Sequence, residues 1–211
     1  MTHTPTAISY TMRRVVLVLL LVIGCTPASE SSYRNGDIIF HESRSSQSVA
    51  LRLAMNSRYT HMGVIYINDG KPFVYEAVGP VKVTPLQEWI DRGIDGHYVV
   101  KRLKDADRIL TPEALTRLKE VGKRFSGRPY DLRFEWSDDR IYCSELVWKM
   151  YHSALGLEIG SRQTFADFDL SSPEVAAKIK ERYPDGLSMN EPVISPASIF
   201  ESPHLVLVET L

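Results

Sequence analysis

Three side chains in this sequence have the types that a thiol hydrolase needs, namely Cys143, His61 and Glu76. A cysteine nucleophile requires a base within hydrogen-bond reach, and the base requires a partner that orients it. His61 opens the apolar run 61–67, and Glu76 lies near the end of a second run that follows the turn signal Asn-Asp-Gly at 68–70. This pattern predicts a β-hairpin that carries a histidine and an acid on its two strands.

The register of this hairpin decides whether His61 and Glu76 can meet. If residues 68–71 form the loop, residue 63 pairs with residue 76. Because side chains alternate along a strand, His61 and Glu76 then share one face of the sheet as diagonal neighbours. A shift of one residue would move Glu76 to the opposite face. In the first register, Glu76 can hold one imidazole nitrogen and leave the other for Cys143.

Cys143 lies at or just before the first turn of an expected helix. Apolar residues recur with helical spacing from residue 147 to 155, and Gly156 provides a C-terminal stop. Unpaired N–H groups and the positive end of the helix dipole favour a thiolate at this position and lower the pKa of a cysteine. The nearby Glu145 acts in the opposite direction. A small buried cysteine that packs the helix start is the alternative interpretation.

Three further residues are candidates for substrate contacts: Tyr142, Gln47 and Asp37. Tyr142 directly precedes the cysteine, and the amide of Gln47 has the chemistry to donate to a substrate carbonyl. Asp37 follows Gly36 and is better explained as a turn residue, and Gln47 is better explained as a polar loop residue. The histidine and the glutamate have ordinary alternatives too, as a strand cap and a solvated strand-end charge.

Composition indicates one globular domain and excludes several function classes. The chain has 211 residues, 44% hydrophobic residues, 24% charged residues and a net charge of −1, which suits a domain with a real core. Acidic and basic residues are interleaved, so a nucleic-acid surface with a clustered basic face is not expected. The cysteines and histidines have no metal-ligand spacing, and we expect neither a metal nor an organic cofactor.

The N-terminal segment has the pattern of an export signal. Two arginines precede a short apolar stretch that is too short to span a bilayer and ends in Val-Ile-Gly-Cys at 22–25, which resembles a bacterial lipobox. We therefore expect a lipoprotein signal peptide at 1–24, lipid attachment to Cys25, a polar tether at 25–35 and the catalytic domain at 36–211. The expected location is the bacterial cell envelope, and Thr26 after the cysteine favours the periplasmic face of the outer membrane.

The expected elements give an α+β domain, because strands gather in the first half of the chain and helices in the second. Short apolar runs predict strands at 38–40, 61–67, 73–77, 81–84, 97–103 and 204–208. Helices are expected at 49–55, over one or two turns within 85–92, from 112 to about 126, from about 143 to 155, and at 172–182.

The order of four motifs resembles a known family. Gly36 to Phe40, His61 to Tyr66, Val74 to Ala77 and Tyr142 to Val147 are similar to the YaeF/YiiX group, circularly permuted relatives of the NlpC-type papain-like cell-wall peptidases. In the unpermuted enzymes the cysteine helix comes first. The resemblance implies a permuted papain-like α+β fold, with the thiol helix packed on an antiparallel sheet, a Cys143 nucleophile, a His61 base and Glu76 as the orienting residue.

One departure affects the expected substrate. The unpermuted enzymes commonly have an aspartate immediately before the cysteine, and this chain has Tyr142. This difference fits the permuted group and leaves the usual cell-wall substrate open.

Three functions remain open at this stage. The first is a thiol peptidase or amidase that cleaves an amide bond in a peptide, possibly derived from peptidoglycan, through an acyl-enzyme. The second is a cysteine-dependent acyltransferase or lipid hydrolase, similar to the lecithin:retinol acyltransferase group, which an apolar cleft beside Cys143 would favour. The third is a peptide-binding module without turnover. In each case we expect the lipid anchor at Cys25 to hold the protein at a membrane.

Overall fold

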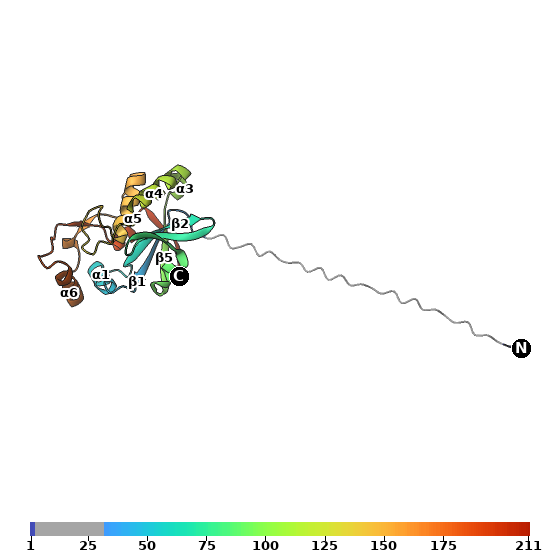
Figure 1. Ribbon diagram of the computed structural model, residues 1–211, viewed down its shortest axis with the longest axis horizontal. Coiled ribbons are helices and arrows are strands. Elements are labelled where there is room, and N and C mark those ends of the chain that lie inside the picture. Colours follow the sequence, from blue (N-terminus) through green and yellow to red (C-terminus); the bar gives the residue numbers. More distant parts are fainter. Residues whose placement is uncertain (3–31) are drawn as a thin grey trace. The chain divides into compact units, whose positions relative to one another are not determined.

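The computed structural model describes residues 1–2 and 32–211, and residues 32–211 belong to one compact unit (Figure 1). The expected signal peptide at 1–24, the lipidation site Cys25 and most of the tether at 25–35 lie outside the described residues. Among the helices that the structure describes, none has the length and apolar character needed to cross a membrane.

A six-stranded antiparallel sheet forms the centre of this unit, with the strand order β4-β3-β2-β1-β5-β8. The strands are β1 (Ile38–Ser43), β2 (His61–Asn68), β3 (Lys71–Ala77), β4 (Val81–Pro85), β5 (Gly93–Leu103) and β8 (Leu205–Thr210). A separate pair consists of β6 (Gln163–Thr164) and β7 (Pro192–Val193).

The helices fall into three groups around the sheet. The longest two pack together against one face, and one short helix covers the other face. Two more pack against each other at one end of the domain in Figure 1. The longest two are α4 (Pro112–Phe125) and α5 (Cys143–Leu155), and the short helix on the other face is α2 (Leu86–Asp91). The pair at the end of the domain consists of α1 (Ser48–Met55) and α6 (Pro173–Arg182). The remaining short elements are α3 (Ala106–Ile109), η1 (Phe165–Asp167) and α7 (Pro196–Phe200).

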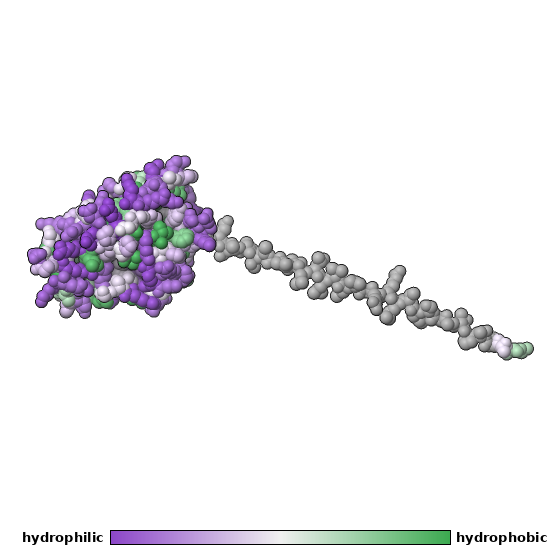
Figure 2. All heavy atoms as spheres, in the orientation of Figure 1, coloured by the Kyte–Doolittle hydropathy of each residue, from purple (hydrophilic) through white to green (hydrophobic). Residues whose placement is uncertain are grey.

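Both faces of the central strands are buried, which explains why their sequences are continuously apolar. In β1, Ile38 and Phe40 point into the core under α5, whereas Ile39 joins the second core under α2. A strand with two covered faces has no reason to alternate with polar residues. The outer surface has the opposite character: on the face drawn in Figure 2, hydrophilic residues predominate and hydrophobic ones form small groups.

The expected hairpin register is confirmed. Val64 pairs with Tyr75, so the two strands run in the alignment that places His61 and Glu76 on one face. The Asn-Asp-Gly turn at 68–70 therefore sets the register that the predicted histidine–acid contact requires.

Gly63 lies in β2 between His61 and Val64, the residue that pairs with Tyr75 of β3. A Cβ atom there would clash with Val74 Cγ1 and approach the carbonyl oxygen of Tyr75 to 2.6 Å. Only glycine therefore lets β2 and β3 come this close beside the histidine.

The expected fold class is confirmed as well, since α5, which carries the cysteine, packs on an antiparallel sheet. The helix and strand predictions agree with the observed elements within a few residues. The short elements α3, η1, α7, β6 and β7 were not predicted, because segments of two to five residues have no measurable periodicity.

Candidate active site

Cys143 is the first residue of α5, and its thiol is buried with 3% exposure. Tyr142 precedes it in an extended conformation, so the chain turns into the helix at the cysteine itself. The backbone N–H groups of Met62 and Ser144 donate hydrogen bonds to the sulfur. One of these amides, that of Ser144, is a free N–H of the helix start, as the sequence pattern predicted, and the other comes from β2.

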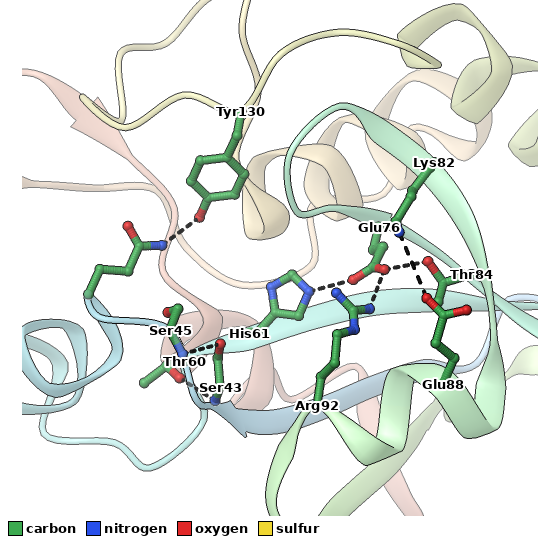
Figure 3. Close-up of polar contacts among 11 residues, drawn as sticks. Ser43, Ser45, Thr60, His61, Glu76, Lys82, Thr84, Glu88, Arg92 and Tyr130 are labelled. Atoms are coloured by element: carbon green, nitrogen blue, oxygen red, sulfur yellow. Dashed lines mark hydrogen bonds and ion pairs between the residues drawn. The ribbon is translucent and has the colours of Figure 1, made fainter.

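The imidazole of His61 lies between the thiol and a carboxylate. Its Nε2 lies 2.7 Å from Oε2 of Glu76, and the ring also forms a hydrogen bond with Cys143. Since Nε2 faces the carboxylate, Nδ1 is the nitrogen that remains for the sulfur. Figure 3 shows the ring in this position, with one nitrogen directed at Glu76 and the other on the side of Tyr130.

Glu76 is fully buried, and each of its oxygens has partners. Oε2 binds His61, while Oε1 accepts a hydrogen bond of 2.5 Å from the Thr84 hydroxyl and a second bond from the Arg92 guanidinium. Burial alone would raise the pKa of Glu76, but the contacts with His61, Thr84 and Arg92 outweigh it and lower the pKa. The carboxylate is therefore charged when it faces the imidazole.

The electrostatics of the site favour a thiolate–imidazolium pair. Burial raises the pKa of Cys143, but the hydrogen bond and charge of His61 and the two backbone amides outweigh burial and lower it. Burial lowers the pKa of His61, yet the bonds and charges of Cys143 and Glu76 raise it to about 9. These opposite shifts favour transfer of the thiol proton to the ring, and the pair titrates as a unit.

A second histidine supports the first one from behind. His41 is buried, stacks on Trp89 with 3.8 Å between ring centroids, and lies 5.3 Å from the His61 ring. Burial, followed by the charges of His61 and Arg92, lowers the pKa of His41 to about 2. His41 therefore stays neutral and does not compete with His61 for the proton.

Tyr130 supplies a hydroxyl on the other side of the thiol. The residue lies in the segment between α4 and α5, and its hydroxyl forms a hydrogen bond with Cys143. Burial, followed by the charge of Cys143, raises the pKa of Tyr130 well above its ordinary value, so the group stays protonated and can donate. A hydroxyl beside the nucleophile is placed to bind a negative oxygen that forms there.

An apolar cleft of about 110 Å³ opens beside the sulfur. Helices α1 and α6, the η1 region and the β7 strand form its walls, and Lys178 and Arg182 are the charged side chains among the described residues of its lining. Its apolar walls comprise Ala50, Leu51, Ala54, Met55, Phe134, Phe165, Phe168, Leu170, Val175, Ile179, Val193, Ile194 and Pro196. These walls match an apolar substrate group, and the described lining offers no carboxylate to a substrate amine.

The three predicted substrate residues lie in different environments. Gln47 and Tyr142 line the cleft next to Cys143. The Tyr142 hydroxyl accepts a hydrogen bond from the backbone of Ile194, so it also fixes the cleft wall. Asp37 does not line the cleft, and its buried carboxylate accepts bonds of 2.6 and 2.7 Å from Arg102. We therefore correct its assignment from substrate contact to buried ion pair.

The opposing charge of Glu145 is largely balanced. Its buried carboxylate lies 2.8 Å from Nζ of Lys149, one turn along α5. Burial raises the pKa of Glu145 to about 7, although the Lys149 bond and charge lower it. The group consequently opposes a thiolate at Cys143 less than an unpaired carboxylate would.

Several residues of the site were not identified from the sequence. Tyr130 lies in a segment without periodicity, and Thr84 and Arg92 belong to the far end of β4 and the residue after α2. The position of Thr84 did contain a signal, because β3 and β4 pair antiparallel and Thr84 alternates onto the face of Glu76. Nothing local in the sequence indicates that Tyr130 or Arg92 reaches the site.

Comparison with known proteins gives a consistent result. Residues 32–209 match the family described as permuted papain-like amidase enzyme, YaeF/YiiX, C92 family. The uncharacterized protein YiiX of Escherichia coli K12 is 48% identical over 197 residues, which are 93% of this chain and 96% of YiiX. The crystal structure of metalloprotein yiiX from Escherichia coli O157:H7 matches with a TM-score of 0.81 and 49% identity, covering 84% of this chain and 97% of that one.

Because yiiX is described as a metalloprotein, a metal site in this chain needs to be considered. Within residues 1–2 and 32–211, no group of three or more His, Cys, Asp and Glu side chains lies close enough to hold an ion. The His61 and Glu76 side chains bind each other, and the thiol binds the imidazole instead.

Proposed function

Because the chain belongs to the YaeF/YiiX family of permuted papain-like amidases, we propose that it is a cysteine hydrolase that cleaves an amide bond through an acyl-enzyme at Cys143. The observation that carries this proposal is the continuous row of hydrogen bonds from Cys143 through His61 to Glu76 at the edge of a cleft. A buried thiol with an ordinary pKa would be a poor nucleophile at neutral pH. The hydrogen bond to His61 lowers the pKa of Cys143 and so provides a stronger nucleophile.

The reaction follows from the protonation states of the pair. The thiolate attacks the substrate carbonyl carbon, a C–S bond forms, and the carbonyl oxygen becomes an oxyanion. The Tyr130 hydroxyl and the backbone N–H of Ser144 at the start of α5 would stabilise that oxyanion. His61 gives its proton to the leaving nitrogen as the C–N bond breaks, and a thioester at Cys143 remains.

Water completes the cycle with His61 as the base. The neutral ring accepts a proton from a water molecule whose oxygen attacks the thioester carbon. The C–S bond then breaks, the acid is released and the thiolate–imidazolium pair returns. Throughout, Glu76 keeps the ring oriented and stabilises its positive form, because its charge lies 2.7 Å from Nε2.

The lining of the cleft favours a second candidate for the substrate. A cysteine-dependent acyltransferase or lipid hydrolase would place an acyl chain among apolar side chains, and thirteen apolar residues of α1, α6 and the neighbouring segments provide such walls. Each buried methylene group would contribute about 0.8 kcal/mol. A peptide derived from peptidoglycan fits this lining less well, because no carboxylate of the described lining faces a substrate amine.

One experiment separates these candidates. Purified protein is incubated with muropeptides, N-acyl amino acids of increasing chain length and phospholipids, and both the products and the intact protein are analysed by mass spectrometry. A Cys143→Ser variant serves as the control, because it retains the shape of the side chain. Release of an acid together with an acyl adduct on Cys143 supports the proposal. No product and no adduct from any of these substrates would refute it and favour a binding module.

The membrane location remains a proposal of its own. The lipobox-like sequence before Cys25 supports a lipid anchor, and the polar segment that follows would tether the domain to the membrane. Growth with a labelled fatty acid should label the full-length protein in a bacterial host, and Cys25→Ala should abolish the labelling.

A further inference from the structure

Gln47 has two hydrogen-bond partners that together determine its orientation. Its Nε2 donates to the Tyr130 hydroxyl at 3.2 Å, and its Oε1 accepts from the Arg182 guanidinium at 2.9 Å. Gln47 is also the N-cap residue of α1, yet its side chain forms no hydrogen bond with the helix. The amide is thus used entirely between Arg182 and Tyr130.

The direction of every bond in this row follows from what each group can do. A guanidinium has only donors, so the amide atom that faces Arg182 must be oxygen. The amide nitrogen then faces Tyr130, and because this nitrogen can only donate, the phenol oxygen must accept. The phenol proton is consequently directed away from Gln47, toward its other partner, the sulfur of Cys143.

We propose that Arg182 and Gln47 are positioning residues that fix the direction of the Tyr130 O–H bond. Tyr130 then donates its proton to the thiolate of Cys143 and, after the attack, to the oxyanion of the substrate. This inference rests on the proposed function, because it assigns how the donor of that site is oriented. Arg182 is the last residue of α6, and Gln47 is the N-cap residue of α1.

The geometry also excludes the opposite orientation. If the amide turned by half a rotation, its NH₂ group would face the Arg182 guanidinium and two donors would oppose each other. Arg182 is held in place by a further bond of 3.1 Å to the carbonyl of Leu132, and its guanidinium lies 5.8 Å from the centre of the Phe134 ring. A fixed cation therefore enforces the orientation of the amide, and the amide enforces that of the phenol.

A single substitution at position 47 reverses the direction of the hydrogen bond to Tyr130 without changing the size of the side chain. In Gln47→Glu, the carboxylate still accepts from Arg182, but its second oxygen also accepts and turns the Tyr130 proton away from the sulfur. The thiolate then loses one charge-assisted hydrogen bond, and its titration midpoint should rise by ~1 to 2 pH units. The measurement is the rate of iodoacetamide labelling of Cys143 across a pH series.

The new negative charge at position 47 also raises the pKa of the thiol through space, and a second background removes this ambiguity. In Tyr130→Phe there is no phenol proton to redirect, so Gln47→Glu should shift the midpoint there by the charge effect alone. The other titratable groups that interact with the thiol of Cys143, namely His61 and Tyr142, are the same in both backgrounds. A larger shift in the protein that retains Tyr130 than in the Tyr130→Phe variant supports the proposal.

Equal shifts in both backgrounds, or no shift in either, would overturn it. If circular dichroism shows that Gln47→Glu does not fold, Arg182→Met takes its place. This variant releases the Gln47 amide, so the Tyr130 proton is no longer directed at the sulfur. The titration midpoint of Cys143 should then rise by a smaller amount, and again only where Tyr130 is present. Labelling needs no substrate, so the two proposals fail separately. A wild-type thiol that titrates ordinarily would contradict the proposed function, whereas an activated wild-type thiol with unchanged variants would contradict only the positioning by Arg182 and Gln47.

Discussion

Replacing Glu76 by glutamine should disable the site more than the loss of one charge suggests. Arg92 can only donate, so it should select the amide oxygen of the new side chain, as it now selects Oε1 of the carboxylate. The amide NH₂ group would then face Nε2 of His61. Because Nε2 would have to accept, the neutral ring would hold its proton on Nδ1, where it can no longer take one from Cys143.

The magnitude follows from the pKa of His61, which lies at about 9 instead of 6.5. This difference corresponds to about 3 kcal/mol of preference for the charged ring, supplied by Cys143 and Glu76 together. The thiolate–imidazolium pair exists between a lower pH limit, set by Cys143, and an upper pH limit, set by His61. Loss of the Glu76 charge should lower the upper pH limit by ~1 pH unit or more. The lower limit, set by Cys143, should rise because a weaker cation stabilises the thiolate less. We expect turnover to fall by a factor on the order of 10³ to 10⁴.

The assay is the pH dependence of iodoacetamide labelling and of turnover for the wild type and Glu76→Gln. Thr84→Val is the matched control, because it removes a hydrogen bond to the same carboxylate but leaves its charge, and it should move both limits only slightly. Adding Arg92→Met to Glu76→Gln frees the amide to present its oxygen to His61, and part of the turnover should return. A Glu76→Gln protein whose upper limit stays near that of the wild type and whose turnover is hardly reduced would refute this reasoning.

Three other substitutions test the roles of residues around the site. Asp37→Asn should lower the free energy of unfolding, measured with urea, by about 3 kcal/mol because it breaks the buried ion pair with Arg102. The pH profile of Cys143 labelling should stay unchanged in the folded protein, and an altered profile would contradict a purely structural role. Gly63→Ala should cost roughly 1 to 3 kcal/mol in the same measurement, since its Cβ atom would clash with Val74 Cγ1, and an unchanged stability would show that the strands can separate. Ala54→Trp should fill the cleft and lower kcat/KM for long apolar acyl substrates more than for short ones, and equal losses for both would place the acyl chain elsewhere.

The parts of the site that were predictable from the sequence depend on local rules. The Asn-Asp-Gly turn at 68–70 sets the register of β2 and β3, and the register alone brings His61 and Glu76 to one face. The position of Cys143 at the start of α5 follows from the helical spacing after it. In each case neighbouring residues determine the geometry, so a single sequence is sufficient.

The residues that sequence reasoning missed or misplaced depend on contacts between distant segments. Tyr130 reaches the thiol because its segment forms a bridge with Ile141, just before α5, and no short-range pattern encodes this pairing. Asp37 was misplaced for a related reason. An aspartate after glycine usually marks an exposed turn, and only the fold brings Arg102, 65 residues away, to its buried carboxylate.

The site thus combines groups with different mechanical support. Cys143, His61 and Glu76 stand on a helix and two strands of the central core, which holds their geometry closely. Tyr130, the proposed oxyanion donor, stands by contrast in the segment between α4 and α5, and its hydroxyl accepts from Gln47, which in turn accepts from Arg182. Because Arg182 also lines the cleft, a substrate group in the cleft would lie beside the Arg182–Gln47 contact that we propose orients this donor. Substrates with different acyl groups should therefore differ in kcat more than in the pH limits of the thiol, since the first depends on the cleft wall and the second on the core.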